Sequence, residues 1–144
     1  MQKLPYYKFS GTILIRLMVA LVFLSEGLQK LLLPAAMGAG RFKTIGIPYP
    51  QFTGPFVGLT EIICGSLLLI GLFTRIACFP LLIVILTAIY TTKVPILLEK
   101  GFWAAAHESR ADFCMLLCLI FLLLYGAGKY SIDSTFVRHG KNAS

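Results

Sequence analysis

The sequence predicts an all-α integral membrane protein built as a four-helix bundle. Its 144 residues are 58% hydrophobic and only 13% charged, with a mean hydropathy of +0.84. Soluble domains are about 45–50% apolar and about 25% charged. The apolar residues form continuous runs, whereas the strands of a membrane β-barrel would alternate. We therefore expect a single transmembrane domain over residues 1–144, with no length left for a separate soluble module.

Four apolar runs have close to the length that crosses a bilayer as a helix, which is roughly 20 residues. We expect spans at about residues 11–33, 55–73, 76–92 and 111–127. The third span is short because Lys93 and Pro95 are expected to end its helix.

The connections between these runs differ in character. Residues 33–55 contain glycines, prolines and two basic residues, and we expect them to lie at the membrane interface. Residues 71–75, "GLFTR", predict a tight hairpin. Residues 95–109 predict a second interfacial stretch, in which Phe102 and Trp103 suit the head-group belt.

The charge balance indicates lipid as a partner and argues against nucleic acid. The net charge is +7, but the basic residues fall between apolar runs and form no patch within polar sequence. They are placed to meet anionic lipid head groups. Arg16 interrupts the first run, and no small-residue cleavage site follows it. We therefore expect that run to be retained as a span and not removed as a signal peptide.

Four spans place both termini on the same side of the membrane. The basic residues divide evenly between the terminus side (Lys3, Lys8, Arg75, Lys129, Arg138, Lys141) and the other side (Lys30, Arg41, Lys43, Lys93, Lys100, Arg110). When Lys30, Lys93 and Arg110 are counted as membrane-embedded and not as loop charges, the terminus side has the larger number of basic loop residues. On that basis we expect cytoplasmic termini.

Ionisable residues inside the apolar runs are the strongest functional signal. An ionised side chain at mid-bilayer costs about 2.5–3.5 kcal/mol on insertion scales, so each such residue needs a partner or a function. Glu26 and Lys30 are one turn apart in the order that favours an ion pair. Glu61 lies in a stripe of small residues, Gly54, Gly58 and Gly65. Such a stripe lets membrane helices approach closely, so we expect Glu61 between helices.

These residues and the start of the last span are expected to share the outer half of the membrane. The predicted ligand pocket consists of Glu26, Lys30, Glu61, His107, Glu108, Arg110 and Asp112. Arg16 and Arg75 belong to the opposite half. Arg110 is expected to pair with the neighbouring acids or to bind a carboxylate or quinone oxygen. The alternative is that the charges only hold the bundle together and reach toward the interface.

Metal and cysteine chemistry are less favoured. "HE" at residues 107–108 lacks the second histidine of a zinc motif, and we expect no metal site. The four cysteines, Cys64, Cys78, Cys114 and Cys118, form no C-x-x-C pair. We expect them to pack as small apolar side chains, because a Cys114–Cys118 disulfide within a helix has poor geometry.

Three stretches resemble the DoxX family of small four-span membrane proteins over about residues 11–134. In "RLMVALVFLSEGLQKLL" the resemblance is carried by Arg16, Phe23, Gly27 and Lys30. In "GLTEIICGSLLLIGLFTR" it is carried by Gly58, Glu61, Gly65, Gly71, Thr74 and Arg75. "AHESRADFCMLLCLIFLLLYGAGKYSID" resembles the ending of a bacterial subgroup through His107, Glu108, Arg110, Asp112, Phe113, Gly126, Gly128, Ser131 and Asp133.

The resemblance implies a multi-pass protein of the bacterial inner membrane. The family is named for a subunit associated with quinone-linked oxidation of sulfur compounds. The resemblance thus implies a subunit or accessory of a membrane oxidoreductase system, binding a quinone or similar molecule beside a membrane or periplasmic partner. Whether the chain is itself an enzyme stays open, because its cysteines offer no redox pair. The competing hypothesis is a non-catalytic assembly or binding protein. A transporter is less favoured without inverted repeats, unless the chain forms homo-oligomers.

Overall fold

The computed structural model describes residues 11–135, and this part of the chain is helical, without strands. The elements are α1 (Thr12–Leu32), α2 (Ala39–Thr44), α3 (Pro50–Ile70), α4 (Thr74–Ala88), η1 (Ile89–Lys93), α5 (Val94–Lys100) and α6 (Phe102–Tyr125). The predicted all-α class is confirmed. Four basic residues of the charge count, Lys3, Lys8, Arg138 and Lys141, lie outside the described residues.

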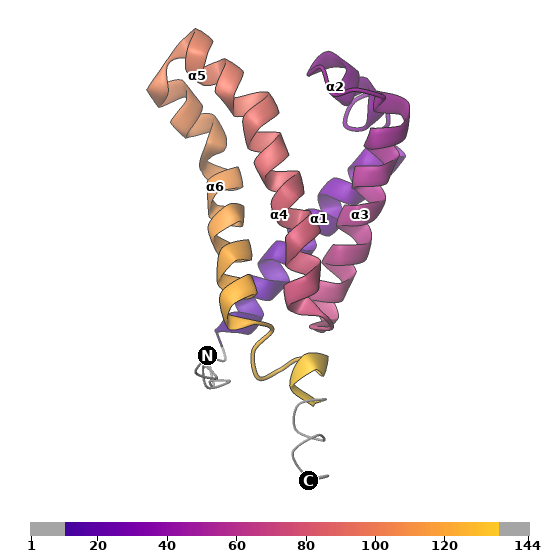
Figure 1. Cartoon of the computed structure of the whole chain (residues 1–144), viewed down its shortest axis with the longest axis vertical. Coiled ribbons are helices and arrows are strands. Elements are labelled where there is room, and N and C mark those ends of the chain that lie inside the picture. The colour runs from indigo at the N-terminus through magenta and orange to yellow at the C-terminus, as the bar shows by residue number, and fades with distance from the viewer. Residues whose placement is uncertain (1–10, 136–144) are drawn as a thin grey trace.

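The helices form two arms that meet at one end and diverge at the other (Figure 1). The first arm contains α1, α2 and α3, and the second contains α4, η1, α5 and α6. Helix α1 crosses behind the others, from the end of α6 to the beginning of α3. We call the end with the α3–α4 turn the closed end, and the end with α2 and α5 the open end.

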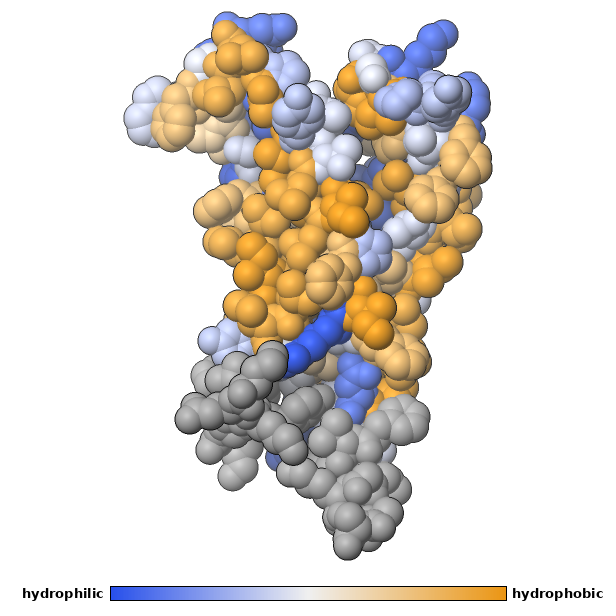
Figure 2. All heavy atoms as spheres, in the orientation of Figure 1, coloured by the Kyte–Doolittle hydropathy of each residue, from blue (hydrophilic) through white to orange (hydrophobic). Residues whose placement is uncertain are grey.

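The outer surface is apolar over the length expected of a membrane protein. Three helices are long and apolar enough to cross a bilayer: α1, α3 and the continuous helix Thr74–Lys100. Helix α6 has 24 residues but carries three charged residues in its first half, at positions 108, 110 and 112. Hydrophobic atoms cover the middle of the face seen in Figure 2. The chain is a helical membrane bundle.

Glycines bring α1 and α3 into the closest contact of any two helices. A Cβ atom at Gly27 would lie 2.6 Å from the carbonyl oxygen of Gly58, and one at Gly58 would lie 3.1 Å from the carbonyl oxygen of Gly27. Only glycine leaves room for backbones this close. The small-residue stripe predicted around Glu61 is therefore a helix–helix interface, and Glu61 itself is buried.

The apolar core fills the closed half of the molecule. Its fully buried members are contributed by all four long helices: Val19 and Ala20 from α1, Leu68 from α3, Cys78 and Leu81 from α4, and Leu119 and Leu122 from α6. Tight packing here fixes the angle at which the two arms separate. The open half is left without such a core.

Polar contacts tie the closed end together. Arg16 donates from Nη1 to the carbonyl oxygen of Ala127 at 2.8 Å, and Arg75 donates from Nη2 to that of Leu124 at 2.9 Å. The Asp133 carboxylate accepts from the backbone N–H groups of Phe73 at 2.8 Å and Thr74 at 3.0 Å. The residues after α6 thus bind both α1 and the α3–α4 turn.

The third helix does not end at Lys93 and Pro95. It continues to Lys100 through the π-helical turn η1, after which Pro95 occupies the first turn of α5. The π turn shifts the backbone hydrogen bonds by one residue, which lets the helix pass a residue that has no N–H. The wider π turn thus absorbs the proline without ending the helix.

The segment expected at the interface between the third and fourth spans is also helical. Gly101, with φ 83° and ψ 178°, is the single residue between α5 and α6, so the last helix begins at Phe102, ahead of the span expected from about residue 111. Helix α3 begins at Pro50, five residues before the predicted span. The α3–α4 turn at residues 71–73 agrees with the predicted hairpin.

Candidate functional site: a charged cavity between the arms

A cavity of about 800 Å³ lies between the two arms. Its walls come from α1, α3, α4 with η1, and α6, together with α2 at the rim. Most of the lining is apolar, and the polar residues gather in two groups. This size and composition are typical of small-molecule pockets, which occupy about 300–1,000 Å³.

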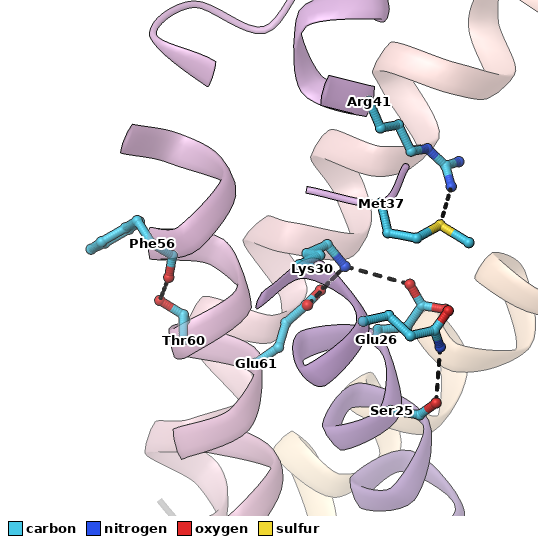
Figure 3. Close-up of polar contacts among 9 residues, drawn as sticks. Ser25, Glu26, Lys30, Met37, Arg41, Phe56, Thr60 and Glu61 are labelled. Carbon is cyan, nitrogen blue, oxygen red and sulfur yellow. Dashed lines mark hydrogen bonds and ion pairs between the residues drawn. The ribbon is translucent and has the colours of Figure 1, made fainter. Parts of the chain in front are cut away.

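The first polar group centres on Lys30 (Figure 3). Its Nζ atom lies 2.8 Å from Oε2 and 3.1 Å from Oε1 of Glu61, and 3.4 Å from Oε2 of Glu26. The Glu61 side chain is only 3% exposed, whereas that of Glu26 is 51% exposed. Glu61 is therefore the fixed partner of the ammonium group, and Glu26 is the partner that is free to move.

Local sequence places these three residues. Glu26 and Lys30 follow one another by one turn of α1, and Glu61 faces them from α3. A Cβ atom at Gly58 would lie 3.1 Å from Cβ of Lys30, so glycine there lets the lysine stem pass between the helices. The ion pair thus depends on the glycine contact between α1 and α3.

The second polar group faces the first from the other arm. Nζ of Lys93 lies 3.3 Å from Oδ2 of Asp112, with side chains 17% and 24% exposed. Lys93 is the last residue of η1, and Asp112 belongs to α6. The nearby Thr91 and Thr92 hydroxyls donate to the carbonyl oxygens of Thr87 and Ala88 within the same helix.

Sequence reasoning did not include Lys93 in the pocket. It was expected to end a helix together with Pro95 and was counted as membrane-embedded only for the charge balance. The available signal was a basic residue inside an apolar stretch, "IYTTKVPILL", with an acid in the following span. Arg41 of α2 was also not predicted. It lies at the rim, with Nη1 3.8 Å from Sδ of Met37 (Figure 3).

The remaining predicted pocket residues lie elsewhere on α6. His107 and Glu108 line a separate recess with Ile96, Lys100 and Ala104, between α5 and α6. Nη1 of Arg110 lies 2.7 and 2.8 Å from the two ring nitrogens of His107, and no ion pair within residues 11–135 involves Arg110. The cavity thus unites Glu26, Lys30, Glu61 and Asp112, without the other three.

The pocket residues predicted on α6 are separated because their side chains project from different faces of the helix. Because α6 begins at Phe102, His107 is already in its second turn and faces α5, while Asp112 faces η1. Arg16 and Arg75 lie at the closed end, away from the cavity, and hold the end of α6.

The cysteines are free thiols and lie outside both recesses. Cys64 and Cys78 are buried in the core, and Cys118 is partly buried. Cys114 is exposed on α6, so the expectation that it packs inside the bundle does not hold. Within residues 11–135, no group of three or more histidine, cysteine or acidic side chains is placed to hold a metal ion.

The arrangement can bind a molecule that is mainly apolar but has a polar head. Lys30 and Lys93 can donate hydrogen bonds from opposite walls, and the exposed Glu26, which makes the longer contact, can yield its place on Lys30 to such a head. The apolar surface between them excludes water, which strengthens each of these hydrogen bonds. Fold and cavity together define an all-helical, multi-pass membrane protein with a charged internal site.

Comparison with known proteins then places the chain in a family. The sequence profile of DoxX matches residues 11–94, more than half of the chain. The chain is 50% identical over 129 residues to the uncharacterized membrane protein Rv3486 of Mycobacterium tuberculosis, covering 85% of this chain and 79% of that protein. No solved structure gives a significant match. The chain belongs to the DoxX family.

Proposed function

We propose that the cavity binds a small molecule with an apolar body and a polar head, with a quinone as the candidate, and that the chain serves as a membrane subunit or accessory of an oxidoreductase system. The observation that supports this proposal is the cavity itself. It places Lys30 with Glu61 on one wall and Lys93 with Asp112 on the other, in a volume of about 800 Å³.

The arrangement of the ion pairs favours binding of a ligand carbonyl over a role that is limited to holding the helices together. Lys30 is already held by both oxygens of the buried Glu61, so its longer contact with the exposed Glu26 adds little to packing. An ammonium group has three hydrogens to donate. Lys30 can therefore keep Glu61 and turn from Glu26 to a ligand oxygen without leaving a buried charge unpaired.

The experiment compares two glutamates on the same chain. Purified protein in detergent is incubated with decylubiquinone, and bound quinone is measured by extraction and mass spectrometry. We expect Glu61→Gln to weaken binding by about tenfold or more, equivalent to about 1.4 kcal/mol. Glu108→Gln is the matched control, because Glu108 lines the separate recess between α5 and α6. The proposal fails if wild type binds no quinone or if both variants bind as wild type does.

The second candidate is a non-catalytic assembly or binding protein. It is favoured by the fact that Lys30, Glu61, Lys93 and Asp112 all find partners within the chain, so they need no ligand. In that case Glu61→Gln would lower the thermal unfolding midpoint, and no ligand would be released by any variant. If wild type binds quinone and Glu61→Gln does not, the result contradicts this second candidate.

A further inference from the structure

We infer that the ligand reaches the cavity sideways from the bilayer, between α3 and α4, and that it is a long-tailed molecule with an uncharged head. This inference rests on the proposed function, and adds to it the route of access and the charge of the head group. Four observations carry it: the exposed rim of the cavity, the height of that rim, the balance of charges inside, and the apolar path between rim and charges.

The rim between α3 and α4 is formed by exposed apolar side chains. Phe56 of α3 and Ile83 of α4 both line the cavity, yet they are 58% and 67% exposed. The two helices are joined by a three-residue turn at the closed end and diverge from there. Figure 2 shows the gap between the two arms at the open end of this face, with mainly apolar atoms below it.

The height of this rim places it against lipid tails. Ile83 comes nine residues after Thr74, which is about 14 Å along the helix from the closed end. Both flanking helices are long and apolar enough to cross the membrane. A side opening at this height faces hydrocarbon, so a molecule dissolved in the bilayer meets it directly, and a water-soluble one does not.

The charges that line the cavity cancel. There are three acids, Glu26, Glu61 and Asp112, and three bases, Lys30, Arg41 and Lys93. All but Arg41 take part in ion pairs. Beyond Arg41 at the rim, both lysines already have carboxylate partners, so a charged head would have to displace one of these ion pairs in an environment of low dielectric constant, which is costly. The head group that fits is therefore uncharged, with oxygens or hydroxyls that form hydrogen bonds.

The surface between the rim and the charges accepts a hydrocarbon chain. Val84 of α4, Val57 of α3 and Met115 of α6 are among the apolar residues that line the cavity. The tail gains little from leaving lipid for protein, since both are apolar. Its contribution is to confine the molecule to the bilayer, where the head is delivered to the height of the opening.

The test uses two isoleucines of α4 that are equally exposed but differ in whether they line the cavity. Ile83 is 67% exposed and Ile76 is 66% exposed, but only Ile83 lines the cavity. The full chain is placed in phosphatidylcholine nanodiscs, and the association and dissociation of radiolabelled decylubiquinone are followed by rapid filtration. The tailless ubiquinone head is measured in parallel as the water-soluble probe.

A blocked route slows arrival and departure alike. We expect Ile83→Trp to slow both rates by about tenfold with little change in Kd, which is their ratio, while Ile76→Trp behaves as wild type. Ile83→Ala, which widens the opening, should speed both rates. We also expect wild type to bind the tailless head from water much more slowly than decylubiquinone.

The two proposals fail in different ways. If wild type binds decylubiquinone and Glu61→Gln abolishes binding, but Ile83→Trp and Ile76→Trp both keep wild-type rates, the side route is wrong and the proposed function stands. If the tailless head binds as fast as decylubiquinone, access is from water at the open end and the inference is again wrong. If wild type binds neither probe, the proposed function and the inference fall together.

Discussion

Asp133 caps the start of helix α4, although it is distant from that helix in the sequence. Helix α4 begins after Phe73, whose side chain has no oxygen to cap the helix and whose φ of 49° is left-handed. The first N–H groups of a helix need an acceptor, and Asp, Asn, Ser and Thr normally provide one at the preceding position. Here both carboxylate oxygens of Asp133, from 60 residues away in sequence, accept from Phe73 and Thr74.

Removing this remote cap should destabilise the closed end. We expect Asp133→Ala to lower the free energy of unfolding by about 0.5–2 kcal/mol, the range measured for caps. Asp133→Asn should lose less, because its amide oxygen still accepts one of the two bonds. SDS titration of the purified chain in mixed micelles measures the change. Lys129→Ala, an exposed change in the same segment, serves as the control, and an Asp133→Ala chain as stable as wild type would contradict the prediction.

At the scale of elements, the α1–α3 pair forms a rigid arm. Its backbones touch at Gly27 and Gly58, and the ion pair of Lys30 with Glu61 lies beside that contact, since a Cβ atom at Gly58 would be 3.1 Å from Cβ of Lys30 and one at Gly27 would be 3.0 Å from Cβ of Glu61. The second arm is held mainly at its closed half, where α4 packs on α6. The cavity is therefore bounded by one closely packed pair of helices and one pair with a π turn in its wall.

Replacing the glycines between α1 and α3 by alanine should destabilise the chain by different amounts at different positions. Gly27→Ala should lower stability by about 1–3 kcal/mol, the usual cost of overpacking, because its Cβ meets backbone that cannot retreat. It should also weaken quinone binding by moving Lys30 from Glu61. Gly65→Ala is the milder control and should lose less, since its Cβ would lie 3.1 Å from the side chain of Leu24 and 3.2 Å from the carbonyl oxygen of Ala20, whereas that of Gly27 would lie 2.6 Å from a carbonyl oxygen. Equal losses in the two variants, measured by SDS titration, would contradict this account.

Continuous apolar runs were enough to predict the helical membrane bundle, and the position of the acids and lysine within them was enough to predict that Glu26, Lys30 and Glu61 lie together. The spacing of Glu26, Lys30 and Glu61 in helices of known length indicated that they share a face and a depth. The other wall of the cavity was not predictable, because Pro95 is a strong local signal for a helix end. The π turn that overrides it depends on contacts with α6, which lie outside any local window. The same long-range packing turns His107 toward α5 and away from the cavity.

At the scale of the whole molecule, the open and closed ends differ in the chemistry they expose. The open end carries α2, α5 and the aromatic pair Phe102 and Trp103, whose ring centroids are 5.3 Å apart. The closed end carries Arg75 and the segment after α6. The charge count predicts cytoplasmic termini, which would set the open end on the outer side of the membrane.

Cysteine labelling tests this orientation. With the four native cysteines replaced by serine or alanine, Trp103→Cys should react with a membrane-impermeant maleimide added to intact cells. Lys129→Cys, at the closed end, should react only after the cells are broken. Both positions are exposed, so access alone does not distinguish them. The opposite labelling pattern would invert the predicted topology.

The single residue Gly101 between α5 and α6 also bears on how the chain enters the membrane during synthesis. Two long helices joined by one glycine leave no polar loop that could wait in water while the first of them inserts. They are expected to enter together as a helical hairpin. Lys93 and Asp112 then arrive as a neutralised pair, and the cost of about 2.5–3.5 kcal/mol for each lone charge is reduced. The contact that forms a wall of the cavity would thereby help the translocon to accept the charged last helix.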